Sequence, residues 1–452
     1  MPSICLLVPT ISPRLSYICD LIFGSLMQLD YELSTNLGHN IDNTKIYMYY
    51  STNIFFDHTP NTIFLLQSTD FLFCKDIDEV NISVSHFNEI PTLFSHENKD
   101  SLLPFDIFAA AFYLVSRYEE YLPYAPDAHG RFSAAKSVAA KHHFLHLPIV
   151  SIWTKILAQK LYHINNNFIY KPLKYELHCT YDIDMAFAYK GKNLRQTFGR
   201  LALNTLYMRI AALRERLAVW QQQSPDPFDT FDYITIQTQK QIPNDHFLAP
   251  VFFFLLGDYS QYDKNVSHKN KDFIATIQRV AAQYQTGIHP SYQASKYLDA
   301  DTNNDVQLQK EIRRLQEITN SNTIALSRQH YLRLRLPHTY AQLLRNGITH
   351  DYTMGYADAL GFRAGIAVPF KWFDVRQNAA TALTVVPFCA MDTTLRAYLC
   401  LTPETAVADL QALAQTLHTY GGQFGMIWHN SSLSDRDEWR GWRRVYEAFL
   451  DM

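Results

Sequence analysis

The chain has 452 residues and a formal net charge of -3, with 47% hydrophobic and 18% charged residues. This composition is typical of a globular protein with a large core, and the length predicts two or three domains. The charge provides no basic field for nucleic acid or an anionic membrane surface. No apolar run reaches the roughly 18 residues that predict a membrane span.

The six cysteines are scattered and form no C-x-x-C pair. This spacing favours reduced thiols over a zinc knuckle or a disulfide scaffold. The apolar N-terminus has no basic region and is interrupted by Pro9 and Pro13, so we interpret it as a strand and then a helix, not a signal peptide. We therefore expect a cytoplasmic protein.

The first part of the chain is predicted to be a mixed α+β domain over residues 1–170. Residues 103–132 and 142–164 both contain apolar positions at helical spacing. The first of these stretches includes SRYEEYLPY, which has three interpretations: a site, a seam between domains, or a solvated face. The polar segment 165–172 ends in Pro172 and predicts the boundary of a second domain, 171–452.

After Pro172, short apolar runs alternate with helical segments. The predicted strands are 174–181, 251–256, 286–289, 323–327, 382–388 and 423–428, and the predicted helices include 273–284, 308–319, 339–347 and 402–421. This alternation predicts a parallel sheet with right-handed crossovers, in a closed or nearly closed α/β barrel. An open doubly wound sheet is the alternative, but no glycine-rich phosphate loop follows a strand.

Polar side chains follow each predicted strand at the point where chemistry takes place in α/β barrels. They are Asp182, Asp184, Asp258, His289, Ser327, Arg328, Asp392 and His429. Each taken singly could be a helix cap, a loop carboxylate or a histidine bonded to backbone. Together they predict one polar rim at the carboxyl ends of the strands.

Asp182 and Asp184 are one residue apart at the end of a predicted strand. Side chains two positions apart in a strand share a face, so both carboxylates point the same way. Two carboxylates this close repel unless a cation or a base lies between them. A divalent metal, or a base beside a metal ligand, accounts for the pair.

Four motifs carry a family resemblance. They are Thr180-Tyr181-Asp182-Ile183-Asp184, the segment beginning at His289, GFRAGIAVPF with Arg363, and MIWHN with His429. They resemble the motifs of the polysaccharide deacetylase family (carbohydrate esterase family 4, NodB-homology fold). Residues 1 to about 170 resemble the N-terminal domain of unknown function that a subgroup carries, most clearly in LPFDIFAAAFYLVSRYEEYLPY.

The resemblance implies a distorted barrel of about seven parallel strands and a divalent metal, usually zinc. It also implies removal of an N- or O-acetyl group from a sugar. By the match of motifs, Asp182 is the catalytic base, Arg363 orients that base, and His429 protonates the leaving group. Asp184 and His289 match metal ligands.

The chain departs from the family at the third metal ligand, because Gln293 stands where the second histidine of His-x-x-x-His belongs. A neutral glutamine is a poor zinc ligand. Either Asp182, Asp258 or Asp392 completes the site, or the metal is a harder, oxygen-preferring ion, or the site is weak or inactive.

Three functions follow from these observations. The first is a metal-dependent hydrolase that removes acetyl groups from a sugar or polysaccharide precursor. The second is a carbohydrate-binding or assembly protein on a degenerate deacetylase barrel, which Gln293 favours. The third is a metal-free sugar hydrolase that pairs Asp182 with Asp258 or Asp392. Each takes a carbohydrate as its partner, and the sequence leaves the oligomeric state open.

Overall fold

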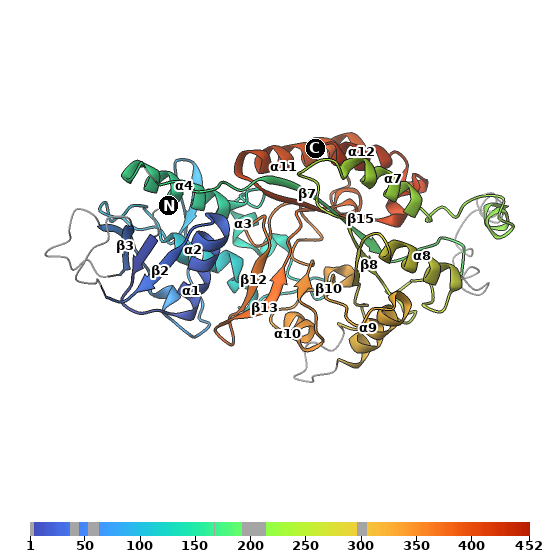
Figure 1. Ribbon diagram of the computed structural model, residues 1–452, viewed down its shortest axis with the longest axis horizontal. Coiled ribbons are helices and arrows are strands. Elements are labelled where there is room, and N and C mark those ends of the chain that lie inside the picture. Colours follow the sequence, from blue (N-terminus) through green and yellow to red (C-terminus); the bar gives the residue numbers. More distant parts are fainter. Residues whose placement is uncertain (1–3, 37–44, 53–62, 167, 192–213, 296–304) are drawn as a thin grey trace.

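The computed structural model describes residues 4–36, 45–52, 63–166, 168–191, 214–295 and 305–452, and its two larger sheets are parallel or mostly parallel (Figure 1). The first sheet belongs to the N-terminal part and has the strand order β2-β1-β3-β4, with every pair parallel. Its strands are β1 (Ile4–Leu7), β2 (Tyr31–Ser34), β3 (Ile46–Ser51) and β4 (Ile63–Gln67). An antiparallel hairpin of β5 (Val84–Phe87) and β6 (Ile90–Leu93) completes this part, so its mixed strand and helix content is as predicted.

The N-terminal part also contains four α-helices among the described residues. They are α1 (Pro13–Cys19), α2 (Ile107–Val115), α3 (Val138–Lys141) and α4 (Ile149–Ile164). Asp106 begins α2 by accepting a hydrogen bond from the backbone N–H of Ala109, as an N-cap residue does. Every residue of α2 is buried, which explains why its sequence is apolar on all sides.

The second sheet has nine strands in the order β12-β13-β11-β10-β9-β8-β7-β15-β14. Neighbours are parallel throughout, except that β12 is antiparallel to β13. The strands are β7 (Tyr175–Ile183), β8 (Val251–Phe254), β9 (Gln285–Ile288), β10 (Leu326–Ser327), β11 (His350–Asp351), β12 (Phe370–Asp374), β13 (Ala379–Val385), β14 (Ala390–Met391) and β15 (Gly422–His429).

The predicted barrel is not confirmed. Among the residues that the structure describes, no strand pairing joins β12 at one edge of the sheet to β14 at the other. The parallel sheet itself is confirmed, and each strand predicted after Pro172 is present. Because neighbouring strands are parallel, their carboxyl ends still meet at one edge.

Helices follow the strands as predicted. They are α7 (Phe231–Gln241), α8 (Lys271–Ala281), α9 (Val306–Thr319), α10 (His338–Arg345), α11 (Pro403–Tyr420) and α12 (Arg443–Leu450). Thr402 caps α11 with a capping box, Pro403 is its first residue, and Gly421 ends it. The helix packs on β7 and β15, near the β14 edge of the sheet (Figure 1). In the described ranges, no helix has the length and apolar character needed to cross a membrane.

The two parts of the chain share a continuous apolar core. Tyr17 of α1, for example, packs against Phe373 of β12 with ring centroids 5.0 Å apart. The SRYEEYLPY stretch lies at this seam: Arg117 and Glu120 are both buried, and Glu120 forms an ion pair with Arg363. The seam interpretation therefore holds for this stretch. The division of the chain near residue 170 stays a prediction and falls in the segment between α4 and β7.

Candidate metal centre

Five side chains from four different segments meet at the carboxyl edge of the large sheet. Asp182 lies in β7 and Asp184 directly follows it, His289 follows β9, and His429 ends β15. His330 begins a short turn, His330–Leu332, after β10. The register between β7 and β15 places His429 opposite Asp182. Most of the predicted polar rim is therefore assembled by the strand order.

Asp184, His289 and His330 form a cluster that could bind a metal ion. One ligating atom of each lies within 4.8 Å of the others. The Oδ1 atom of Asp184 is 3.1 Å from Nε2 of His289, and Oδ2 is 3.5 Å from Nε2 of His330. Both histidines are buried, whereas the Asp184 side chain is 30% exposed, so the cluster has an open side.

The other ring nitrogen of each histidine is held by the protein. Nδ1 of His289 is 2.6 Å from the carbonyl oxygen of Arg328, and Nδ1 of His330 is 2.9 Å from Oδ1 of Asp263. An Nδ1–H that donates to an oxygen leaves the Nε2 lone pair free to bind a metal, and such outer partners are typical of metal-binding histidines.

The cluster also fits a cation by charge. The buried Oδ1 of Asp184 has no hydrogen-bond partner in the described part of the chain, although Nε2 of His289 is close. A buried oxygen of this kind is costly without a partner. Two imidazoles and one carboxylate around an open side suit zinc and related divalent ions.

His330 was not predicted as a ligand. The three carboxylates considered for the third position have other partners: Asp258 pairs with Lys310 and Arg314, Asp392 bonds His429, and Asp182 bonds Arg328. The second histidine is thus supplied from the loop after β10, not from the position of Gln293. The only sequence signal for it was its place just beyond a predicted strand.

Charge also shifts the pKa of the cluster residues. Burial raises the pKa of Asp184, but His330, His289 and His429 hold it well below the usual value. Burial lowers the pKa of His330, but Asp184 and Asp263 raise it to about 9. The attraction between His330 and its two neighbouring carboxylates, Asp184 and Asp263, therefore outweighs the effect of burial on the His330 imidazole.

Asp182 is buried beside the cluster. Its Oδ2 atom is 4.0 Å from Nε2 of His289, and its Oδ1 atom is 3.3 Å from Nη1 of Arg328. Arg328 is itself fully buried and donates to Thr180 Oγ1 at 2.7 Å and to the Tyr352 carbonyl at 3.1 Å. These bonds fix the guanidinium and, through it, one oxygen of Asp182.

The prediction that Arg363 orients Asp182 is wrong. The guanidinium of Arg363 donates to both carboxylate oxygens of Glu120, at 2.9 and 2.6 Å, and to the Gly355 carbonyl at 3.0 Å. Arg363 therefore joins the two parts of the chain, and Arg328 occupies the position beside the base. The strand-end pattern had included Arg328, but the family match had favoured Arg363.

His429 lies beside the cluster, in β15, paired in register with Asp182 of β7. Its Nδ1 atom is 2.7 Å from Oδ1 of Asp392, and its Nε2 atom is 3.7 Å from Oδ2 of Asp184. Burial lowers the pKa of His429, but Asp392, Asp184 and Asp182 raise it to about 10. The imidazole is therefore protonated at neutral pH, and a bound cation would reduce this effect of the carboxylates.

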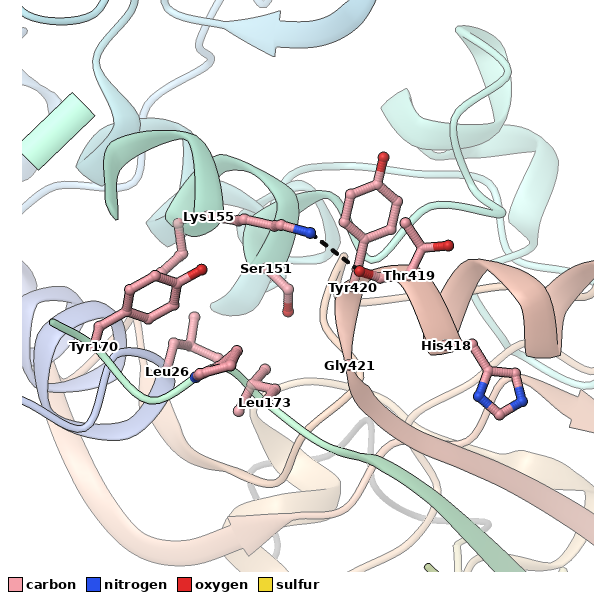
Figure 2. Close-up of a pocket in the computed structure, with 11 residues that line it drawn as sticks. Leu26, Ser151, Lys155, Tyr170, Leu173, His418, Thr419, Tyr420 and Gly421 are labelled. Atoms are coloured by element: carbon pink, nitrogen blue, oxygen red, sulfur yellow. Dashed lines mark hydrogen bonds between the residues drawn. The ribbon is translucent and has the colours of Figure 1, made fainter. Parts of the chain in front are cut away.

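A separate pocket of about 200 Å³ lies between the N-terminal part and α11. It is lined by residues of α4 and of the end of α11, and Figure 2 shows Lys155 reaching the Thr419 carbonyl, at 3.2 Å. Its one histidine, His418, stacks on Tyr175 with centroids 3.9 Å apart. The lining contains no carboxylate, so this pocket lacks the groups of the metal cluster.

Comparison with known proteins gives a family for the first third of the chain alone. A family of unknown function, DUF7033, matches residues 4–166. No curated protein matches the chain. The family therefore adds no activity to the site.

Two solved structures have a distant similarity to the chain. The carbohydrate deacetylase Agd3 aligns over 100% of this chain and 83% of its own, with 7% identity and a TM-score of 0.37. A 4-alpha-glucanotransferase from Thermococcus litoralis aligns over 62% of this chain, with 14% identity and a TM-score of 0.33. The aligned region spans 37% of that glucanotransferase. Neither similarity is strong enough to assign a fold or an activity.

Proposed function

We propose that the protein is a metal-dependent hydrolase that removes acetyl groups from a carbohydrate. The observation that carries this proposal is the set of groups around the three candidate ligands. A carboxylate held by an arginine, Asp182, and a histidine held by a carboxylate, His429, both lie beside these ligands. A base and an acid beside a Lewis acid are what acyl hydrolysis needs.

Asp184, His289 and His330 would hold the cation. When bound, a divalent ion supplies Lewis-acid chemistry, because it polarises an acyl carbonyl and lowers the pKa of water. Two histidines and one carboxylate leave a coordination position open, as in catalytic zinc sites.

The remaining steps belong to the side chains of this chain. Asp182 accepts a proton from the attacking water through Oδ2, since its Oδ1 atom is bound to Arg328. His429 donates a proton to the departing nitrogen or oxygen, and Asp392 stabilises the charged imidazole. The acetyl group and the sugar as substrate rest on the motif resemblance, because the geometry itself serves any acyl hydrolysis.

The two alternative functions, a carbohydrate-binding protein and a metal-free glycosidase, have less support from the geometry of the site. A binding protein on a degenerate site was favoured by Gln293, but His330 completes a ligand set without it. A two-carboxylate glycosidase needs a free partner for Asp182. Asp258 is paired with Lys310 and Arg314, and Asp392 is bonded to His429.

Metal content tests the proposal first. Mass spectrometry of the purified protein should find about one divalent ion per chain, as expected for one cluster of three ligands. His330→Ala should lose the ion and Gln293→Ala should keep it. The wild type should release acetate from members of a panel of acetylated saccharides, and Asp182→Asn should release it about 10²–10⁴-fold more slowly. A wild type that binds no divalent metal after incubation with zinc, manganese and cobalt would overturn the proposal.

A further inference from the structure

We infer that residues 127–131 of the N-terminal part join three tyrosines from the loops after β8, β9 and β10 to form a binding surface for a sugar ring beside the metal centre. This surface, which we call the aromatic wall, consists of His129, Tyr262, Tyr292 and Tyr331. The inference deepens the proposed function and rests on it, because it concerns a longer carbohydrate at the same site. It also gives the N-terminal part a role in substrate recognition.

The four rings of the aromatic wall form one cluster. His129 lies over Tyr331 with centroids 4.8 Å apart, and its ring is 5.8 Å from Tyr262 and 6.0 Å from Tyr292. Tyr262 and Tyr292 stack at 4.2 Å. All four residues are partly exposed, which differs from the fully buried rings of the core. Rings that cluster and yet reach the surface are suited to contact a ligand.

The residues of the aromatic wall are neighbours in sequence of residues that form or hold the metal centre. Tyr331 directly follows the candidate ligand His330, and the two rings are 4.7 Å apart. Tyr262 directly precedes Asp263, whose Oδ1 accepts hydrogen bonds from the His330 ring and from the backbone N–H of Tyr292. One buried carboxylate thus holds both a metal ligand and part of the wall. A ligand on the wall therefore lies next to the reacting centre.

The N-terminal segment is fixed on the wall by two arginines. Arg131 pairs with Asp127 at 2.7 Å and donates to the carbonyl of Tyr331 at 2.9 Å. Arg333 donates to the carbonyl of His129 at 2.8 Å and lies 4.1 Å from the Tyr292 ring centre. Tyr331 has a φ of 59°, a left-handed conformation that is unfavourable for a bulky residue and is often found at functional sites. The bond from Arg131 supports this turn.

The chemistry of the wall favours a neutral sugar. A pyranose ring presents a face of C–H groups and a rim of hydroxyls, which match aromatic faces and phenolic hydroxyls. Nδ1 of His129 is buried with no hydrogen-bond partner among the described residues, and a hydroxyl can supply one. Arg131 is neutralised by Asp127, and Arg333 directs Nε and Nη1 to protein oxygens. The wall therefore lacks the free cations that a phosphorylated ligand needs.

Glycan binding to the full chain tests this inference. The background variant is Asp182→Asn, which removes the proposed base so that acetylated glycans are not consumed during the measurement. It should bind at least one acetylated oligosaccharide on a glycan array, and titration of that oligosaccharide gives its affinity. Adding His129→Ala or Tyr262→Ala should lower the affinity about tenfold, as expected for the loss of one aromatic contact.

Matched controls separate the wall from general effects on the protein. His146→Ala and Tyr162→Ala alter exposed residues of the N-terminal part and should leave affinity unchanged. All variants should keep the metal content and the urea midpoint of the background. Equal affinity in wall and background variants, or no binding to any glycan, would overturn the inference. If glycans bind at the wall but the wild type releases no acetate, the wall stands and the hydrolase proposal fails.

Discussion

The guanidinium of Arg328 lies 3.3 Å from a carboxylate oxygen of Asp182, inside the sheet and away from solvent. It reaches Thr180 and the Tyr352 carbonyl through its other nitrogens. A lysine keeps the charge, but its three N–H donors share one nitrogen, so it cannot reach the three acceptors that the separate Nη1, Nη2 and Nε atoms of Arg328 reach. Arg328→Lys should therefore lower the turnover of an acetylated saccharide about 10²-fold, since the base loses its orientation. Steady-state kinetics would measure this change.

Arg363→Lys is the matched control for this prediction. Arg363 bonds Glu120 and Gly355, so its replacement should lower the free energy of unfolding and leave turnover near that of the wild type. Both variants should retain their metal. The assignment of Arg328 as a positioning residue would be lost if the Arg363 variant were the slower enzyme.

Glu120 offers a test of the seam between the two parts of the chain. Its carboxylate pairs with Arg117 at 2.7 Å and with Arg363 at 2.6 Å, and all three side chains are buried. Glu120→Gln removes the negative carboxylate that pairs with the buried guanidinium groups of Arg117 and Arg363. We expect unfolding in urea to require about 3–5 kcal/mol less free energy.

An exposed pair gives the control for Glu120. Glu404 lies 2.6 Å from Arg444, with both side chains more than half exposed. Glu404→Gln should leave the free energy of unfolding close to that of the wild type, because solvent screens an exposed ion pair. If the two substitutions had equal small effects, the buried network would not stabilise the seam.

The sequence predicted the large sheet well because its strands and helices have distinct periods and clear boundaries. The capping residues Thr402, Pro403 and Gly421 placed α11 correctly. The same alternation does not determine whether a sheet closes, because closure depends on strand tilt and stagger across the whole sheet. The alternation of strands and helices therefore predicted a parallel sheet but carried no information on whether that sheet closes into a barrel.

The candidate site was predicted in part for similar reasons. Asp182, Asp184, His289 and His429 lie at the carboxyl ends of predicted strands, so the strand pattern alone located them. His330 follows a strand of two residues and enters a left-handed turn, neither of which has a periodic signal. The partner of Arg363 lies in the other part of the chain, and no local pattern predicts such a contact.

Glu311 should make stability depend on pH. This side chain is fully buried, and its carboxylate accepts bonds from the Ser291 backbone N–H, the Ser291 hydroxyl and Gln307. Burial raises its pKa from 4.5 to about 7. The folded state therefore holds the proton more tightly than the unfolded state. The stability that this gives is present below pH 4.5 and is lost as pH rises toward 7, by up to about 3 kcal/mol.

Glu311→Gln removes this titration and keeps a group that can bond Ser291. Between pH 5 and pH 8, the wild type should lose more unfolding free energy than the variant, with chelator present at both values to exclude metal effects. Urea titrations at the two pH values would measure the difference. Parallel losses in the two proteins would show that Glu311 is not the group responsible.

Metal removal should lower the thermal stability of the folded chain. Asp184, His289 and His330 come from segments far apart in the sequence, so the cluster exists only in the folded state. A ligand that binds the folded state alone stabilises it by about 2.7 kcal/mol at a hundredfold excess over its dissociation constant. Adding a chelator to zinc-loaded wild type should therefore lower the melting temperature. His330→Ala should melt at the same temperature with and without chelator, whereas Gln293→Ala should respond like the wild type. A wild type that is insensitive to both zinc and chelator would contradict a cation in this cluster.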